Sequence, residues 1–342
     1  MKAKVAISLV AVALAGCQSN SKLELVPQQT NHISQGVYEV EFAAARHFSQ
    51  QTQLLVQAVN AYCQTGQDID VVAQMWHTSM TSWMALQGQE RGPQAALEQS
   101  WNVQFWPDKK NTTGRKMSAL LRQSNPAWQV KDIAEQSVTV QGMGALEWLI
   151  YDPASDFKTN VNTCQLGGAI SQNLANNAGR IAQAWQSNPW ITLPQKDWDS
   201  EYIALLSNQL DYSIKKLSRP LAKVGKPRAY FAESWRSETS MLNLKANVVA
   251  MQQLYLANGS GLDARLRQVD KGGLADRIVA QFELTVKTWP TDSSLFTLLK
   301  TKEGYRMVMA QYNKLEHLNY LIHEEVALEL GVVIGFNATD GD

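Results

Sequence analysis

Residues 51–62 read QTQLLVQAVNAY, and their apolar side chains recur three and four positions apart. An α-helix returns to the same face at that spacing, so the segment predicts an amphipathic helix with one buried face, extended at its start from Val37. No long stretch alternates apolar and polar residues, and the strand-like segment 137–140 is too isolated to build a sheet. The sequence therefore predicts an all-α protein. Helical spacing recurs at 71–86, 170–185, 202–217, 242–256, 274–286 and 305–322.

A proline-containing break divides this helical pattern. Residues 187–194 read SNPWITLP, and two prolines in eight residues interrupt a helix because proline lacks the backbone N–H donor. We predict two helical-bundle-like halves packed together, an N-terminal bundle at 34–188 and a C-terminal bundle at 195–342. A single helical array is the alternative.

The first residues have the pattern of an export signal. Lys2 and Lys4 precede an uncharged apolar run at 5–13, which is followed by LAGC at 14–17. The run is far shorter than the ~20 residues of a membrane-spanning helix. LAGC resembles the bacterial lipobox, so we predict a signal peptide at 1–16 and lipidation of Cys17 by acyl chains. An ordinary secretory signal with a chance cysteine is the alternative.

The residues after Cys17 are polar and show no sustained apolar period, which predicts a flexible tether over 17–33. The protein would then be held in the cell envelope by its lipid and face the periplasm. Gln18 rather than aspartate follows the lipidated cysteine, which favours the outer over the inner membrane. The membrane, through the lipid anchor, is thus the one partner that the sequence indicates, and no protein partner is identified.

Charge and cysteine usage narrow the function further. Lys plus Arg and Asp plus Glu both number 31, and no basic cluster is interleaved with aromatic residues. We therefore expect no nucleic-acid partner. Of the three cysteines, Cys17 is assigned to lipid, and Cys63 and Cys164 remain in a compartment where thiols oxidise. We predict that these two form a disulfide.

The common catalytic motifs are missing, so we assign no catalytic residue. His323-Glu324 begins like the zinc-protease pattern His-Glu-x-x-His, but Ala327 stands where the second imidazole is needed. A Gly-x-Ser-x-Gly nucleophile motif, a phosphate-binding loop and a dinucleotide glycine fingerprint are also absent.

Two segments carry polar groups that packing does not explain. Glu147 lies in the apolar run GMGALEWLI at 142–150, and a buried carboxylate needs a partner or a ligand. An ion pair with Arg115 or Arg236 would satisfy it equally well. The last residues, 331–342, are glycine-rich and apolar and end in oxygen-bearing side chains that would suit a hard cation. A solvated terminus is the alternative for that segment.

The same segments resemble the imelysin-like family, which includes iron-regulated protein A and proteins classed as M75 peptidases. Residues 142–149 resemble its Gly-x-His-x-x-Glu signature, and FWPD at 105–108 resembles its early Trp-Pro segment. Residues 234–247 resemble its Trp-Arg-Ser segment, and GFNATDGD at 335–342 resembles the ending of its lipoprotein branch.

The resemblance implies two helical halves with a site near their junction, and it supports pairing Cys63 with Cys164. Glu147 would be the metal ligand, with iron as the ion suggested. Gly144 occupies the position of the family's histidine, and glycine offers neither a metal ligand nor a general base. The ligand-binding residues carried over or expected to line the same cleft are Gly142, Glu147, Asp108, Arg236, Ser240, Asn337 and Asp340.

We therefore expect a non-enzymatic, membrane-anchored binding component linked to the uptake of iron or another metal. A metallopeptidase of the imelysin type is the first alternative, and a structural or docking lipoprotein is the second.

Overall fold

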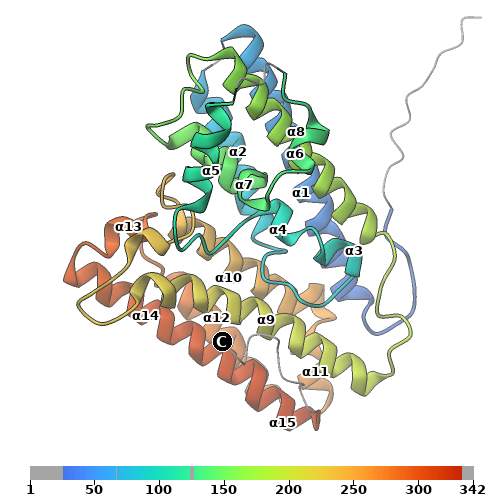
Figure 1. Ribbon diagram of the computed structural model, residues 1–342. Helices are drawn as coiled ribbons and strands as arrows, with labels where there is room; N and C mark the ends of the chain where they lie inside the picture. The colour runs from blue at the N-terminus through green and yellow to red at the C-terminus, as the bar shows by residue number, and fades with distance from the viewer. Residues whose placement is uncertain (1–25, 67, 124–126, 333–342) are drawn as a thin grey trace, which may run out of the picture.

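The computed structural model describes residues 26–66, 68–123 and 127–332. Every regular element in this part of the chain is a helix, so the predicted all-α class is confirmed (Figure 1). Residues 138–140, the strand-like segment, form a single 3₁₀ turn. Cys17, Asn337 and Asp340 lie outside the described residues, as does the predicted signal peptide.

The N-terminal half is built around three long helices. Helix α1 runs along both α2 and α8 and buries one face between them (Figure 1). The helices of this half are α1 (Gln35–Thr65), α2 (Ile69–Trp83), α3 (Gln94–Leu97), α4 (Ser100–Val103), α5 (Thr112–Leu121), α6 (Val130–Ala134), η1 (Val138–Val140), α7 (Gly142–Tyr151) and α8 (Val161–Ala184).

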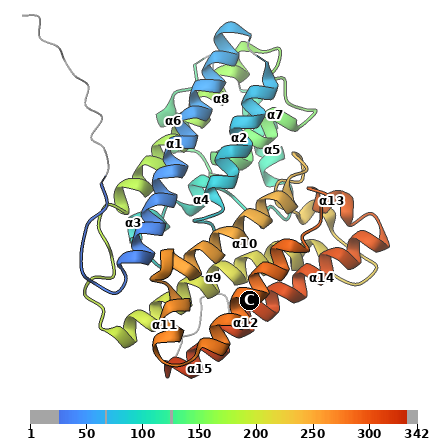
Figure 2. The ribbon, with the colours of Figure 1, turned by 180° about the vertical axis from the view of Figure 1, so that it is seen from behind.

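The C-terminal half is built around α9, α10, α12 and α14, which lie roughly side by side (Figure 2). Figure 2 also places α10 on the side of this half that is turned toward α1 and α2, and α10 contacts both. The elements are α9 (Gln195–Leu221), η2 (Ala229–Phe231), α10 (Ser240–Leu256), η3 (Ala257–Gly259), α11 (Leu262–Gln268), α12 (Gly272–Lys287), α13 (Leu295–Leu298), α14 (Lys302–Asn319), the π-helix η4 (Tyr320–Val326) and α15 (Ala327–Leu330).

The connection between α8 and α9 contains no regular helix and is filled by tryptophan rings. Trp185 and Trp190 pack with their ring centroids 5.4 Å apart, and Trp190 packs on Trp198 of α9 at 5.1 Å. Aromatic pairs at these separations add to the burial of their surface. Trp190 therefore fixes the proline-containing segment to the packed core, although most of the other residues at 187–194 are exposed.

The residues just before α1 also pack against this connection. The Gln28 side chain accepts a hydrogen bond from the Asn188 backbone N–H at 2.9 Å. The His32 ring contacts the Leu193 carbonyl at 2.9 Å. Residues 28–32, which belong to the segment predicted as a tether, thus contact the connection, because it offers their polar groups partners that lie far away in the sequence.

The predicted disulfide between Cys63 and Cys164 is confirmed. Cys63 lies in the last turn of α1 and Cys164 in the first turn of α8, with their Cα atoms 5.7 Å apart. The bond joins residues 101 positions apart in the chain. It therefore fastens together the two longest helices of the N-terminal half at one end.

A buried polar network crosses the junction between the halves. The Lys216 side chain on α9 is 2% exposed, and its Nζ lies 2.5 Å from Glu233 Oε2. Nζ also donates to Gln87 of the N-terminal half at 2.8 Å and to Asn247 of α10 at 2.7 Å. Burial lowers the pKa of Lys216, while the Glu233 carboxylate opposes that change.

None of the helices in the described part of the chain combines the length and apolarity needed to cross a membrane.

Candidate functional site

A small polar cavity of about 40 Å³ lies at the junction of the halves. Its walls come from α2, α7, the segment after α4 and the connection between η2 and α10. Three of the predicted site residues, Asp108, Glu147 and Arg236, line it together with Gly144. The remaining lining combines aromatic side chains with further polar ones.

Helix α7, which carries Glu147, begins at a glycine in a left-handed conformation. Gly142 has a φ of 64°, and a Cβ at this position would lie 2.1 Å from the Val103 carbonyl oxygen. Only glycine fits such a position, because both the dihedral and the close approach exclude a side chain. Gly142, which we predicted to bind a ligand, is not among the residues that line the cavity, and its backbone conformation accounts for the glycine at this position.

Glu147 is buried within the cavity wall, with 6% of the residue exposed. Its Oε1 accepts two hydrogen bonds from Ser237, one from the backbone N–H at 2.9 Å and one from Oγ at 2.8 Å. Burial raises the pKa of this carboxyl, and the Ser237 hydrogen bonds and the nearby Arg236 charge partly offset the rise. Both hydrogen bonds reach Oε1, which leaves Oε2 as the oxygen that faces a ligand in the cavity.

Arg236 does not form the ion pair with Glu147 that the sequence suggested as an alternative. Its Nε donates to Asp152 Oδ2 at 2.7 Å, and an Nη donates to Asn111 Oδ1 at 2.6 Å. The guanidinium also stacks 4.3 Å from the Trp235 ring. Arg115 makes no ion pair in the described part of the chain. Glu147 is therefore held by neutral donors.

Asp108 lines the cavity, but its oxygens are already used. Oδ1 accepts from the Thr112 backbone N–H at 2.6 Å, and Oδ2 accepts from the Thr113 backbone N–H at 2.8 Å. These N–H groups open α5 and have no partner within the helix, so a carboxylate stabilises them. Asp108 thus acts as a structural cap of α5.

Ser240 is not part of the cavity. It is the first residue of α10, and its Oγ accepts from the Leu295 backbone N–H at 2.9 Å. This hydrogen bond fastens the start of α10 to the start of α13. The contact that the structure gives Ser240, which we predicted to bind a ligand, is thus one that packs the C-terminal half.

Gly144 lines the cavity on the same face as Glu147, and a Cβ added to it would meet no atom within 4 Å. The position therefore has room for a side chain but provides no donor. Across the described residues, no three His, Cys, Asp or Glu side chains come together as a metal site would require. The donors present at the cavity, one free carboxylate oxygen beside Gly144, do not fit a resident metal cofactor.

Two residues at the cavity, Ser237 and Glu233, were not among the predicted site residues. Ser237 holds Glu147, and Glu233 lines the cavity while it pairs with Lys216. Ser237 directly follows Arg236 in the Trp-Arg-Ser segment that resembles the family, so that segment could have identified it. Nothing in the sequence links Lys216 to Glu233, because the two lie on different elements of the fold.

The fold and cavity define a class: an all-helical protein of two packed halves, with a buried acidic side chain at their junction. The sequence profile of imelysin, the M75 peptidase family, matches residues 42–322, and the chain belongs to this family. The resemblance predicted from the sequence motifs is thereby confirmed.

Two solved structures have the same fold. An imelysin-like protein from Psychrobacter arcticum 273-4 superposes with a TM-score of 0.74 at 18% identity, covering 89% of this chain and 96% of that one. A putative iron-regulated protein A precursor from Parabacteroides distasonis ATCC 8503 superposes with a TM-score of 0.66 at 14% identity, covering 88% of this chain and 96% of that one. No curated protein sequence matches the chain.

Proposed function

We propose that this chain is a lipid-anchored, periplasm-facing binding protein that serves the uptake of iron or another metal and has no peptidase activity. The observation that carries the proposal is the arrangement of metal-binding atoms in the cavity between the two halves. Glu147 is held in place with one free oxygen, and the neighbouring position is the side-chain-free Gly144.

The metal would be cargo and not a resident cofactor. One carboxylate oxygen fills one coordination position, so water or another small ligand must fill the rest. A cavity of about 40 Å³ can hold an ion with little more than a single water molecule. We expect such binding to be weak and reversible, as suits a protein that passes a metal on.

The link to iron rests on two lines of support. The motifs resemble those of iron-regulated protein A, and one structural relative is described as a putative iron-regulated protein A precursor. The anchor rests on Cys17 and the residues before it.

The geometry of the cavity supports the two alternative functions, a metallopeptidase and a structural lipoprotein, less well. A metallopeptidase needs several metal ligands and a general base around one reactive water, and the described residues bring together no cluster of three or more His, Cys, Asp or Glu side chains. A purely structural lipoprotein would favour a closed apolar junction, whereas this junction encloses a polar cavity lined by Glu147 and Arg236.

Calorimetric titration of the full chain with ferrous iron, under anaerobic conditions, tests the proposal. We expect weak binding that Glu147→Gln removes and Gly144→His strengthens, because a Cβ at position 144 meets no neighbouring atom and an imidazole there would add a second ligand beside Glu147. Glu283→Gln, at an exposed site on α12, is the matched control. The absence of iron binding in the unaltered chain would overturn the proposal, and casein cleavage lost in Glu147→Gln would favour the peptidase instead.

A further inference from the structure

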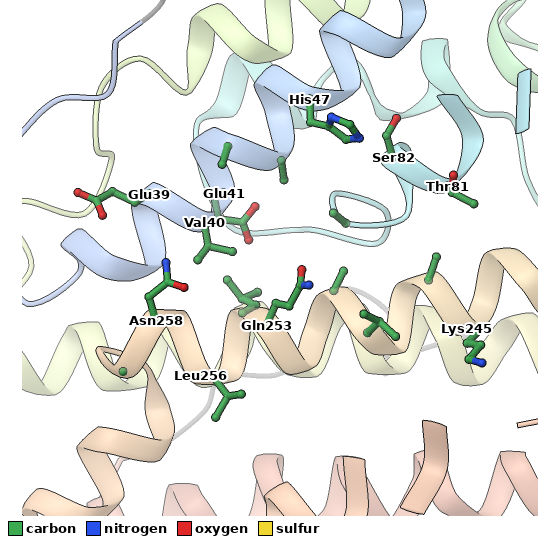
Figure 3. A pocket seen from close by; sticks show the side chains of 18 of the residues that line it. Glu39, Val40, Glu41, His47, Thr81, Ser82, Lys245, Gln253, Leu256 and Asn258 are labelled. Carbon is green, nitrogen blue, oxygen red and sulfur yellow. The ribbon is translucent and has the colours of Figure 1, made fainter. Parts of the chain in front are cut away.

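A second and much larger hollow lies between α1 and α10, away from the Glu147 cavity. It has a volume of about 1050 Å³, at the upper end of the range for pockets that hold small ligands. Figure 3 shows α1 along one side of this hollow and α10 along the other. We call it the α1/α10 groove.

The walls of the α1/α10 groove are apolar and made of small side chains. Alanines on both helices and on the segment after α2 leave the space open, and larger apolar side chains of α10 border it. One of these, Leu242, is 45% exposed, so its apolar surface is accessible to a ligand. The apolar residues are Val40, Ala43, Ala44, Ala85, Leu242, Ala246, Val249, Ala250, Leu254 and Leu256.

One end of the groove is acidic. Glu39 and Glu41 of α1 lie toward this end in Figure 3. Glu41 is only 1% exposed, and it has no ion-pair partner in the described part of the chain. Its Oε2 accepts a hydrogen bond from the Gln89 side chain at 2.5 Å, while its Oε1 is buried without any hydrogen bond. A buried carboxyl oxygen without a hydrogen bond lowers the stability of the fold, and a hydrogen-bond donor on a ligand would remove that cost.

The opposite end carries a positive charge. His47, Ser82, Thr81 and Lys245 lie toward it in Figure 3. Lys245 makes no ion pair or hydrogen bond with the described residues. The groove is thus apolar along its middle, acidic at one end and basic at the other.

The length of the groove sets the size of its ligand. From Lys245 to Leu256, eleven residues of α10 rise about 16 Å, and from Val40 to His47, seven residues of α1 rise about 10 Å. An extended peptide advances about 3.3 Å per residue, so three to five residues span that length. A zwitterionic peptide also places opposite charges at the two ends, whereas a fatty acid places its one charge at a single end.

We propose that the α1/α10 groove binds short apolar peptides in extended form, with the free amino end at Glu41 and the free carboxylate at Lys245. Glu41 Oε1 is covered in the empty groove, and the terminal carboxyl torsion is soft, so a small rotation suffices to present the oxygen to the ligand. Burial keeps this carboxyl protonated at neutral pH, and the ammonium of the peptide takes the place of that proton, which passes to solvent. The apolar side chains of the peptide pack against the alanine-rich walls. This binding does not depend on the Glu147 cavity.

Titration of the full chain carrying Cys17→Ala with the tetrapeptide Ala-Leu-Ala-Leu tests the proposal. We expect N-acetylation of the peptide to weaken binding at least tenfold, and Glu41→Gln to abolish that difference. C-terminal amidation should likewise weaken binding, and Lys245→Gln should abolish the effect. Because the blocked peptides test the unaltered groove, the result stands even if Glu41→Gln fails to fold.

A groove-filling variant locates the binding. Ala250→Phe places a ring in the groove and should weaken tetrapeptide binding at least tenfold, whereas Ala280→Phe, on the exposed face of α12, should leave it unchanged. No binding of the tetrapeptide at millimolar concentration would overturn the proposal, as would binding that Ala250→Phe leaves unchanged. Binding of decanoate in place of the peptide would also overturn it and assign the groove to acyl chains.

Discussion

Replacing Glu41 by glutamine should remove a strong dependence of stability on pH. Burial raises the pKa of the Glu41 carboxyl from 4.5 to about 8, and the Gln89 hydrogen bond only partly opposes that rise. The folded chain therefore holds this proton more tightly than the unfolded chain does. The contribution of the protonated Glu41 carboxyl to folding stability is complete below pH 4.5 and is lost as the pH rises through about 8.

The magnitude follows from the two pKa values. Each pH unit between them costs about 1.4 kcal/mol of folding free energy. Relative to a side chain that stays neutral, the Glu41 carboxyl then destabilises the fold by about 1 kcal/mol at pH 5 and about 4 kcal/mol at pH 8. Glutamine has nearly the same shape and stays neutral throughout. Between pH 5 and pH 8, the free energy of unfolding of the Glu41→Gln variant should therefore rise by about 3 kcal/mol relative to that of the unaltered chain.

Urea unfolding with the disulfide intact, followed by circular dichroism at pH 5, 6, 7 and 8, measures that difference. Comparing variant and unaltered chain at each pH cancels the titration of every other group. Glu283→Gln, at an exposed position of α12, should give a difference that stays constant with pH. A constant difference for Glu41→Gln as well would show that Glu41 ionises normally, and the account of its burial would be wrong.

Three further outcomes follow from the structure. Gly142→Ala should destabilise the fold by about 2 kcal/mol or more in thermal unfolding, because its φ and the Val103 carbonyl exclude a Cβ; an unchanged midpoint would contradict that account. Cys63→Ser should lower the free energy of unfolding by roughly 2–5 kcal/mol, and reductant should then have no further effect on it. Cys17→Ala should move the protein from the membrane to the soluble fraction of fractionated cells, and retention on the membrane would refute lipid anchoring.

The helical class was predictable because each long helix buries one face. Residues 202–217, for example, repeat apolar side chains at helical spacing, and they lie within α9 with their apolar face buried. The disulfide was predictable from counting, since the predicted lipidation of Cys17 leaves two cysteines. These inferences depend on local spacing or on composition, which the sequence displays directly.

The partners of the buried polar groups were not predictable in the same way. Arg236 was a reasonable donor for Glu147, yet it pairs with Asp152, because the connection before α10 presents Ser237 to Glu147 first. Glu41 resembles a surface residue in the sequence, since carboxylates are common on exposed helix faces. Which face of α1 meets the C-terminal half depends on how the two halves dock, and no spacing within α1 encodes that.

The disulfide also bears on the order in which the molecule assembles. Cys63 and Cys164 both precede α9 in the chain, so a chain that emerges amino end first exposes both thiols before the C-terminal half is complete. The disulfide can therefore form within the N-terminal half alone. Lys216 with its partner Glu233 then arrives at a surface that already holds Gln87 in position. The last step of maturation is in that case a docking event, and failure to oxidise would delay it.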